Sequence, residues 1–198
     1  QATTAFIDPA TDVGGNLYTR LSQNGFRRSG RHVYRPSCRG CRACIPVRVP
    51  VDAFRPTRRF RKTTRRNGDL RVGLAPAERT EEIYELYARY VDGRHGDGDM
   101  APASRAQFDG FLSAAWSPTT FVTFRAPAGR LLAVAVVDRL GDGLSAIYTF
   151  FDPAERRRSL GTYAILWQIE HARSLGLPYV YLGYWIAESP KMRYKLDF

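Results

Sequence analysis

The sequence has no apolar stretch long enough to cross a bilayer, and it contains little cysteine. Its longest apolar run, LLAVAVV from Leu131, is far shorter than the roughly 20 residues of a membrane-spanning helix. No charged leader followed by an apolar core opens the chain. The 3 cysteines are an odd number and lie close together, which argues against a secreted disulfide framework. We therefore expect a cytoplasmic protein with no membrane partner.

Acidic residues are also scarce relative to basic ones. The chain has 30 Lys and Arg against 19 Asp and Glu, which gives a formal net charge of +11. Such a charge favours polyanionic partners, and nucleic acid comes first because the arginines cluster. A basic protein without a polyanionic partner stays open as an alternative.

The densest charge lies in RPTRRFRKTTRR, residues 55–66, where six arginines and one lysine crowd together. Arginine binds phosphate through a planar pair of donors, so this preference over lysine fits phosphate contact better than general solubility. The other interpretation is a solvated helix or loop face.

A change in composition over Leu70 to Pro76 divides the chain into two expected parts. Residues 1–70 form a basic subdomain that contains the cysteines, and residues 71–198 form a second domain. In the first part, a short helix is expected over Leu17–Leu21, and VRVPVDAF predicts a strand that Pro50 places at a sheet edge.

The second part alternates helices and strands in a recognisable order. Helices are predicted from Thr80 to Gly93, from a Ser104 cap, and over residues 160–175. Three antiparallel strands come before the last helix, and YVYLGYW is a final strand that should pair in parallel with the strand around Ile147 by a right-handed crossover. This order predicts an α+β fold of the GNAT-like acyltransferase class.

The segment CRGCRAC supplies Cys38, Cys41 and Cys44, one thiolate short of a closed tetrahedral zinc or iron–sulfur site. A fourth ligand would have to come from His32, from elsewhere in the fold or from a segment absent from this chain. Metal ligation, a buried structural thiol cluster and a redox thiol all stay open. Nothing in the sequence indicates a catalytic cysteine.

The loop ERRRSLGTY combines arginines with a helix start. Free N–H groups at Arg158 to Thr162 would suit a phosphate or a polar acyl donor, and the segment resembles the pyrophosphate loop of coenzyme-A-dependent acetyltransferases. Tyr163 stands where that loop expects Gly or Ala, so the match is incomplete. A plain helix start with Ser159 as its cap explains the loop equally well.

Seven segments together resemble one family along almost the whole chain: NGFRRSGRHVYRPSC, CRGCRACIPVRV, FRPTRRFRKTTRRNGDL, LYARYVDGRHGDGDM, YTFFDP, SLGTYAILWQIEHARSLGLPYVYLGYWI and SPKMRYKLDF. This family is the bacterial aminoacyl-tRNA–protein transferases of the N-degron pathway. The similarity is greatest to the leucyl-transferases and more distant to the eukaryotic arginyl-transferases. It also implies segments before Gln1 and after Phe198.

The resemblance implies transfer of leucine from Leu-tRNA to the N-terminal Asp or Glu of a protein, which marks that protein for degradation. An arginyl-transferase of the same fold is the alternative within the family. Two other classes are a coenzyme-A-dependent acetyltransferase and a non-catalytic RNA-binding module. No cofactor is required for the transfer itself, and the cysteines would hold at most a structural zinc ion or iron–sulfur cluster.

An aminoacyl ester is already activated and the incoming amine is the nucleophile, so the enzyme must mainly orient both and stabilise the oxyanion. We expect this to happen where the strand around Tyr148 separates from the final strand. The expected catalytic residues are Tyr148, Thr149, Phe150 and Tyr184. Residues expected to recognise the acidic N-terminus are Arg94, His95, Lys191, Tyr194 and Lys195. The expected tRNA-binding residues are Arg27, Arg28, Arg58, Arg59, Arg61, Arg65, Arg66, Arg158, Ser159 and Gly161.

Overall fold

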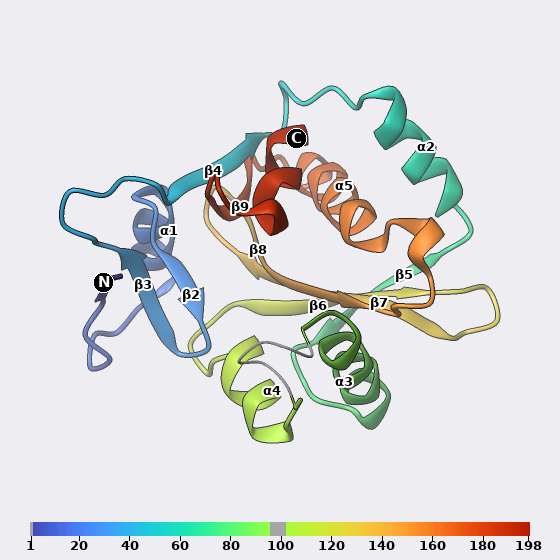
Figure 1. Cartoon of the computed structure of the whole chain (residues 1–198), viewed down its shortest axis with the longest axis horizontal. Helices are drawn as coiled ribbons and strands as arrows, with labels where there is room; N and C mark the ends of the chain where they lie inside the picture. Colours follow the sequence, from blue (N-terminus) through green and yellow to red (C-terminus); the bar gives the residue numbers. More distant parts are fainter. Residues whose placement is uncertain (1, 96–101) are drawn as a thin grey trace.

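The computed structural model describes residues 2–95 and 102–198, and at His95 it describes only the backbone (Figure 1). A six-stranded sheet runs through the molecule, with helices on both faces and a smaller three-stranded sheet at one end (Figure 1).

The small sheet belongs to the N-terminal residues. Strands β1 (Thr4–Phe6), β3 (His32–Pro36) and β2 (Arg27–Ser29) pair in that order, all antiparallel. Helix α1 (Gly15–Gln23) contains the predicted helix. Gly25, with φ of +81°, follows the helix in the left-handed region that glycine favours. These three short strands were not predicted from the sequence.

The large sheet has the strand order β4-β9-β8-β7-β6-β5. Its strands are β4 (Ile45–Pro50), β5 (Arg71–Pro76), β6 (Thr119–Arg125), β7 (Leu131–Arg139), β8 (Gly143–Phe151) and β9 (Tyr179–Trp185). The predicted meander β6-β7-β8 is confirmed, and so are the edge position of β4 and the parallel pairing of β8 with β9. β5 was not predicted, and it pairs with β6 at the other edge. Because β4 joins this sheet, the sheet draws strands from both sides of residue 70.

Two layers of helices enclose the large sheet. Helices α5 (Leu160–Ser174) and α2 (Arg58–Arg66) lie on one side, and α3 (Glu81–His95) and α4 (Arg105–Leu112) lie on the other (Figure 1). The first core is centred on apolar residues of α5, such as Ile169, and the second on residues of α3 and α4, such as Tyr87 and Phe108. The Ser104 hydroxyl accepts a bond from the Gln107 N–H at 3.1 Å, which confirms the predicted helix cap.

Two short 3-10 segments complete the described structure: η1 (Arg156–Arg158) comes before α5, and η2 (Pro190–Asp197) follows β9. None of the described helices combines the length and the apolar character that a bilayer crossing requires.

Candidate functional site

The pairing between β8 and β9 stops part-way along both strands. Only three residue pairs join them: Gly143 with Tyr179, Leu144 with Val180, and Ser145 with Tyr181. Next to this point the register of β8 against β7 skips Ile147, and the register of β9 against β4 skips Leu182. Such bulges bend strands and redirect their side chains. The two strands therefore part beyond Ser145, as the sequence predicted.

The guanidinium of Arg27 lies at the start of this gap. It donates to the Ser145 hydroxyl at 2.9 Å and to the Ala146 carbonyl at 2.7 Å. On the opposite strand, a Cβ added to Gly183 would come within 3.1 Å of Arg27 Nε, so glycine leaves room for the guanidinium. Arg27 thus bridges β8 and β9 where their own pairing ends. Its bonds with described residues use two of its five N–H donors.

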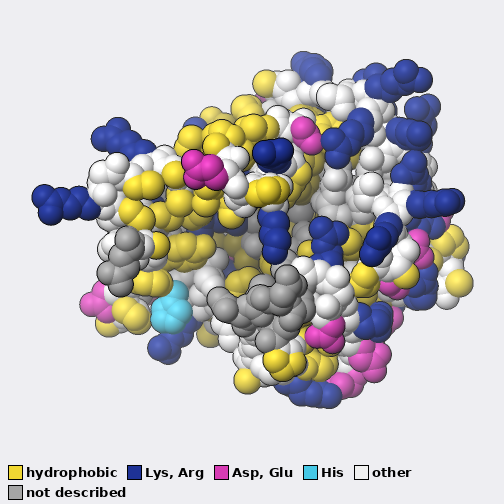
Figure 2. Space-filling view, viewed as in Figure 1, with side chains coloured by type: hydrophobic (Ala, Val, Ile, Leu, Met, Phe, Trp, Pro, Cys, Tyr) yellow, Lys and Arg dark blue, Asp and Glu magenta, His cyan; other side chains and the backbone are white. Residues whose placement is uncertain are grey.

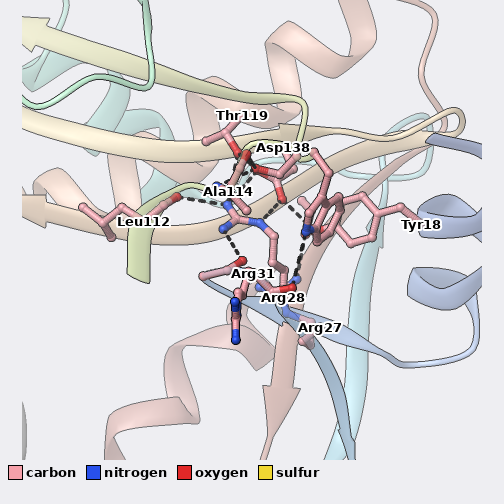
Figure 3. Close-up of polar contacts among 12 residues, drawn as sticks. Tyr18, Arg27, Arg28, Arg31, Leu112, Ala114, Thr119 and Asp138 are labelled. Atoms are coloured by element: carbon pink, nitrogen blue, oxygen red, sulfur yellow. Dashed lines mark hydrogen bonds and ion pairs between the residues drawn. The ribbon is translucent and has the colours of Figure 1, made fainter. Parts of the chain in front are cut away.

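The neighbouring residue of β2, Arg28, points to the other side and is buried (Figure 3). It forms a bidentate pair with Asp138 of β7, with Nε–Oδ2 at 2.6 Å and Nη2–Oδ1 at 2.9 Å. The Tyr18 and Thr119 hydroxyls donate to the same carboxylate at 2.7 and 2.6 Å. Both side chains of the ion pair have no exposed surface.

Arg28 was predicted to bind tRNA, and this prediction is wrong because its charge is buried against Asp138. Burial acts against the charged form of Arg28, but the hydrogen bond and charge of Asp138 outweigh it and raise the pKa of the guanidinium. Burial, together with Asp138, likewise raises the pKa of Tyr18. The pair fixes β2 against β7. It therefore anchors the strand that carries Arg27 into the gap.

A second cation, Lys195 of η2, is half-buried near the same gap. Its ammonium donates to the Tyr184 carbonyl of β9 at 2.5 Å. Burial, and then the charge of Arg27, lower the pKa of Lys195 to about 8. Among the described residues, neither Arg27 nor Lys195 forms an ion pair with a carboxylate. Among the residues that the structure describes, the gap therefore holds two positive charges and no carboxylate paired with either of them.

The Tyr184 hydroxyl, predicted to orient the amine, has another partner. It donates to the Gly25 carbonyl at 2.5 Å, and burial raises its pKa to about 12. This bond ties β9 to the turn after α1. Tyr184 contacts Lys195 through its main-chain carbonyl, which accepts the hydrogen bond from the ammonium.

The other predicted catalytic residues lie on β8 beyond its last pair with β9. Thr149 and Phe150 are in register with Ala135 and Val134 of β7. The Phe150 side chain is fully buried, so it presents only main-chain groups to a substrate. Tyr148 stacks edge-on against Tyr90 and Phe111, and burial raises the pKa of its hydroxyl.

The remaining residues predicted to recognise the acidic N-terminus lie further out. Arg94, near the end of α3, is exposed, with its guanidinium 5.5 Å from the centre of the Phe151 ring. Lys191 is exposed on η2. Tyr194 is partly exposed, and its ring centre lies 5.9 Å from the Lys195 ammonium. The side chain of His95 is outside the described structure.

The predicted tRNA-binding arginines of the basic segment form one exposed surface on α2. Figure 2 shows Lys and Arg side chains gathered along the side of the molecule that α2 occupies. These exposed arginines are Arg58, Arg59, Arg61, Arg65 and Arg66. Arg59 pairs with Asp197 at 3.1 Å, but both side chains are exposed, so the pair leaves its charge accessible.

The start of α5 is held against the end of α2. Arg158 forms a bidentate pair with Asp69 at 2.8 and 2.9 Å, so its charge is already partnered. Ser159 has φ of +52° and its side chain does not cap the helix, contrary to the interpretation of it as a cap. Gly161 lies close to Phe151, because an added Cβ would be 3.2 Å from that ring. The first N–H groups of α5 are therefore not capped by the Ser159 hydroxyl.

The three thiols lie between β3 and β4. Cys41 is exposed, and Cys38 and Cys44 are partly so. The Cys38 sulfur accepts a bond from the Thr3 N–H at 3.2 Å. In the part of the chain that the structure describes, no group of three Cys, His, Asp or Glu side chains could hold a metal ion. This arrangement does not supply a complete metal site, and metal ligation by these thiols stays a prediction.

Comparison with known proteins identifies the family. The family models described as arginine-tRNA-protein transferase, N terminus and C terminus, match residues 1–62 and 82–198. The chain belongs to the arginine-tRNA-protein transferase family. This transferase is 55% identical to a protein of Hahella chejuensis, over 100% of the chain and 84% of the relative. It is also 55% identical to a protein of Alcanivorax borkumensis, over 100% of the chain and 81% of the relative. Both relatives are named aspartate/glutamate leucyltransferase.

Solved structures with little sequence identity share the fold of this transferase. FemX is 13% identical with a TM-score of 0.55, over 95% of this chain and 65% of FemX. L-PGS from Bacillus licheniformis is 9% identical with a TM-score of 0.53, over 74% of this chain and 48% of that protein. These neighbours confirm the predicted GNAT-like acyltransferase fold. The enzyme class, an aminoacyltransferase, follows from the family.

Proposed function

We propose that this chain transfers leucine from Leu-tRNA to the α-amine of proteins that begin with Asp or Glu. One observation carries the proposal: the chain is 55% identical, along its whole length, to relatives named aspartate/glutamate leucyltransferase. A gap in the sheet that contains two cations supports it, because neither cation has a carboxylate partner in the described part of the chain and an acidic acceptor can supply one.

The reaction proceeds without a catalytic side-chain nucleophile. The neutral α-amine attacks the carbonyl carbon of the leucyl ester, and a C–N bond forms. The C–O bond to the ribose then breaks, and the released ribose hydroxyl takes up a proton in place of the one that the amine loses. The amine titrates near pH 8, so it needs only modest help to be neutral.

The gap between β8 and β9 is the proposed place for this reaction. Beyond Ser145, β8 pairs with β7 but not with β9, so the alternate N–H groups of β8 that face the gap can stabilise the oxyanion of the tetrahedral intermediate. The proposed donors lie near Thr149 and Phe150. Tyr148 and its aromatic neighbours form an apolar wall that strengthens such bonds by excluding water.

The proposed receptor for the acidic side chain is the pair Arg27 and Lys195. Burial, and then the charge of Arg27, lower the pKa of Lys195, and a carboxylate bound to both cations would relieve their repulsion. Arg27 therefore acts on the acceptor in this proposal, instead of on tRNA as its sequence context suggested. Arg94, His95 and Lys191 remain proposed outer contacts of the acceptor.

The donor tRNA is proposed to extend from the gap toward α2. The uncapped start of α5, at Ser159 and Gly161, faces the 3′-terminal adenosine, and the exposed arginines of α2 bind phosphates. We also propose that residues 1–70 act as a basic subdomain whose cysteines stabilise it, with or without a metal ion. Degradation of the product in the cytoplasm is the corresponding biological role.

Selectivity for an acidic acceptor should depend on the charge of Lys195. Since burial and Arg27 lower its pKa to about 8, the ammonium loses its proton between pH 7 and 9. The ratio of kcat/KM for an Asp peptide to that for the matching Asn peptide should therefore fall as pH rises over this range. The ratio cancels deprotonation of the α-amine, which affects both peptides.

The control for this profile is Lys195→Arg, whose guanidinium stays charged. Its Asp-to-Asn ratio should stay constant from pH 7 to 9. A falling ratio in Lys195→Arg would show that another group controls the pH dependence.

A transfer assay with radiolabelled Leu-tRNA and Arg-tRNA in parallel tests the proposed function. Label from Leu-tRNA on peptides that begin with Asp or Glu, and not on those that begin with Lys or Ala, is the expected result. Label from Arg-tRNA alone would identify an arginyl-transferase. Intact tRNA binding without label from either donor would indicate a non-catalytic RNA-binding module.

A further inference from the structure

Two adjoining hollows lie on the surface that α2 and α5 share. The first has a volume of about 430 Å³, within the range of small-ligand pockets, and its lining residues are Phe54, Pro56, Arg61, Thr64, Arg65, Tyr163, Leu166, Trp167 and Glu170. The second, of about 530 Å³, is lined by Arg58, Lys62, Arg65 and Arg66 alone. Arg65 lines both hollows, so they are neighbours.

The walls of the first hollow are mainly aromatic and apolar. Trp167 lies in the middle of α5. Its ring stacks on that of His171, with the ring centres 4.6 Å apart, and lies edge-on to the Phe124 ring, with the centres 6.0 Å apart. These contacts fix the indole plane. An aromatic ligand could therefore pack against an already ordered wall and lose little entropy there.

Arginines stand at the rim of this apolar hollow. Arg61 donates to the Pro56 carbonyl at 2.5 Å, which holds its guanidinium at the edge. Arg65 has no carboxylate partner among the described residues. On the α5 side, Glu170 pairs with Arg173 through Oε1 at 2.5 Å, and its Oε2 is the acceptor proposed for an exocyclic amino group. The hollow thus combines a flat apolar wall with one acceptor and a cationic rim.

The second hollow differs because every lining side chain is a cation. Four like charges side by side are unfavourable unless anions join them, and phosphates are the anions that arginines bind best in pairs. Together, an aromatic hollow beside a phosphate-binding hollow has the chemistry of a nucleotide site. A peptide partner is less suitable, since it would need several acidic residues beside one aromatic side chain.

We propose that these hollows bind one unstacked nucleobase of the donor RNA in the first and its flanking phosphates in the second. This inference rests on the proposed function, because the RNA is the tRNA of Leu-tRNA. The base belongs to a part of the tRNA other than the 3′-terminal adenosine, which is assigned to the start of α5. Bases stack on aromatic side chains with little sequence preference, so the site contributes affinity more than sequence recognition.

Thr64→Trp is the variant that tests this site. Thr64 is exposed on α2 and lines the first hollow, so an indole there fills the space without removing a core side chain. We expect affinity for full-length Leu-tRNA to fall about tenfold, the loss typical of one stacked base. The salt dependence of binding should keep its slope, whereas Arg65→Gln should reduce that slope by about one.

Two further measurements separate the site from the reaction. Transfer from a short donor, 3′-O-leucyl-adenosine, should be unchanged in Thr64→Trp, because this donor does not reach α2. Leu175→Trp adds the same bulk at an exposed position beyond α5 and should leave tRNA affinity unchanged. Trp167→Leu, which removes the stacking wall, repeats the test if Thr64→Trp does not fold.

Unchanged tRNA affinity in a folded Thr64→Trp or Trp167→Leu would overturn the proposal. Loss of affinity for free adenosine monophosphate, without loss for tRNA, would also overturn it and assign the site to a free nucleotide. If the wild-type protein transfers no leucine but tRNA affinity still falls in both variants, the proposed function fails and the base-binding site stands.

Discussion

Arg27→Gln should lower kcat/KM for an Asp peptide about a hundredfold while leaving affinity for Leu-tRNA within about twofold. Loss of one partner of a half-buried, hydrogen-bonded charge pair costs roughly 2–5 kcal/mol, which corresponds to such a change. Arg27 lies between Ser145 on β8 and Gly183 on β9, where the acceptor's carboxylate is proposed to bind. Steady-state transfer assays with Asp and Asn peptides measure the effect.

The matched control is Arg31→Gln, which removes an exposed charge from the same segment. Arg31→Gln should change kcat/KM by less than twofold with either peptide. For Arg27→Gln, the loss should be large with the Asp peptide and small with the Asn peptide. If Arg27→Gln instead lowered the affinity for Leu-tRNA, and lowered kcat/KM equally for the Asp and Asn peptides, Arg27 would return to the tRNA-binding role.

Asp138→Ala should lower the free energy of unfolding by about 3–5 kcal/mol, because it leaves the buried Arg28 without its partner. Two hydroxyl groups, of Tyr18 and Thr119, lose the same acceptor (Figure 3). Urea unfolding followed by fluorescence measures this change. A loss below about 1 kcal/mol would show that water or a rearranged side chain replaces the carboxylate.

The double variant Arg28→Met/Asp138→Leu separates stability from positioning. Apolar residues of similar size can replace a buried ion pair at little cost, so this variant should regain much of the lost stability. Activity should stay low, since β2 no longer holds Arg27 at a fixed place in the gap. Full activity in a stable double variant would show that Arg27 needs no such anchor.

The sequence predicted the large elements because their signals are local. The Ser104 cap, the helical spacing of Ile83, Leu86 and Tyr87, and the alternation in VRVPVDAF each specify one element without reference to the rest of the fold. The order of these elements then restricted the topology, so the parallel pairing of β8 with β9 could be predicted as well.

The small sheet and the roles of the two adjacent arginines could not be predicted in this way. β1, β2 and β3 are three to five residues long, too short for a periodic pattern, and they form through long-range pairing. Arg27 and Arg28 read as one basic pair in NGFRRSG. Their roles differ because successive side chains of a strand point to opposite sides, and only the side of Arg28 carries its partner Asp138.

The sequence predicted where the candidate site lies in the fold but not which side chains contact one another there. The gap between β8 and β9 follows from topology, whereas Lys195 reaches it through η2, whose path no sequence pattern specifies. The Tyr184 hydroxyl was predicted to orient the amine because Tyr184 lies on the final strand, which borders the expected gap. Its bond to Gly25 depends on a turn that is distant in the sequence.

A crystal structure with an amide-linked leucyl-adenosine and an Asp peptide would test the central claim most directly. The account predicts the leucyl carbonyl in the gap between β8 and β9, with the Asp carboxylate within hydrogen-bonding distance of both the Arg27 guanidinium and the Lys195 ammonium. A carboxylate bound to Arg94 or Lys191 instead, or a leucyl group outside the gap, would contradict it.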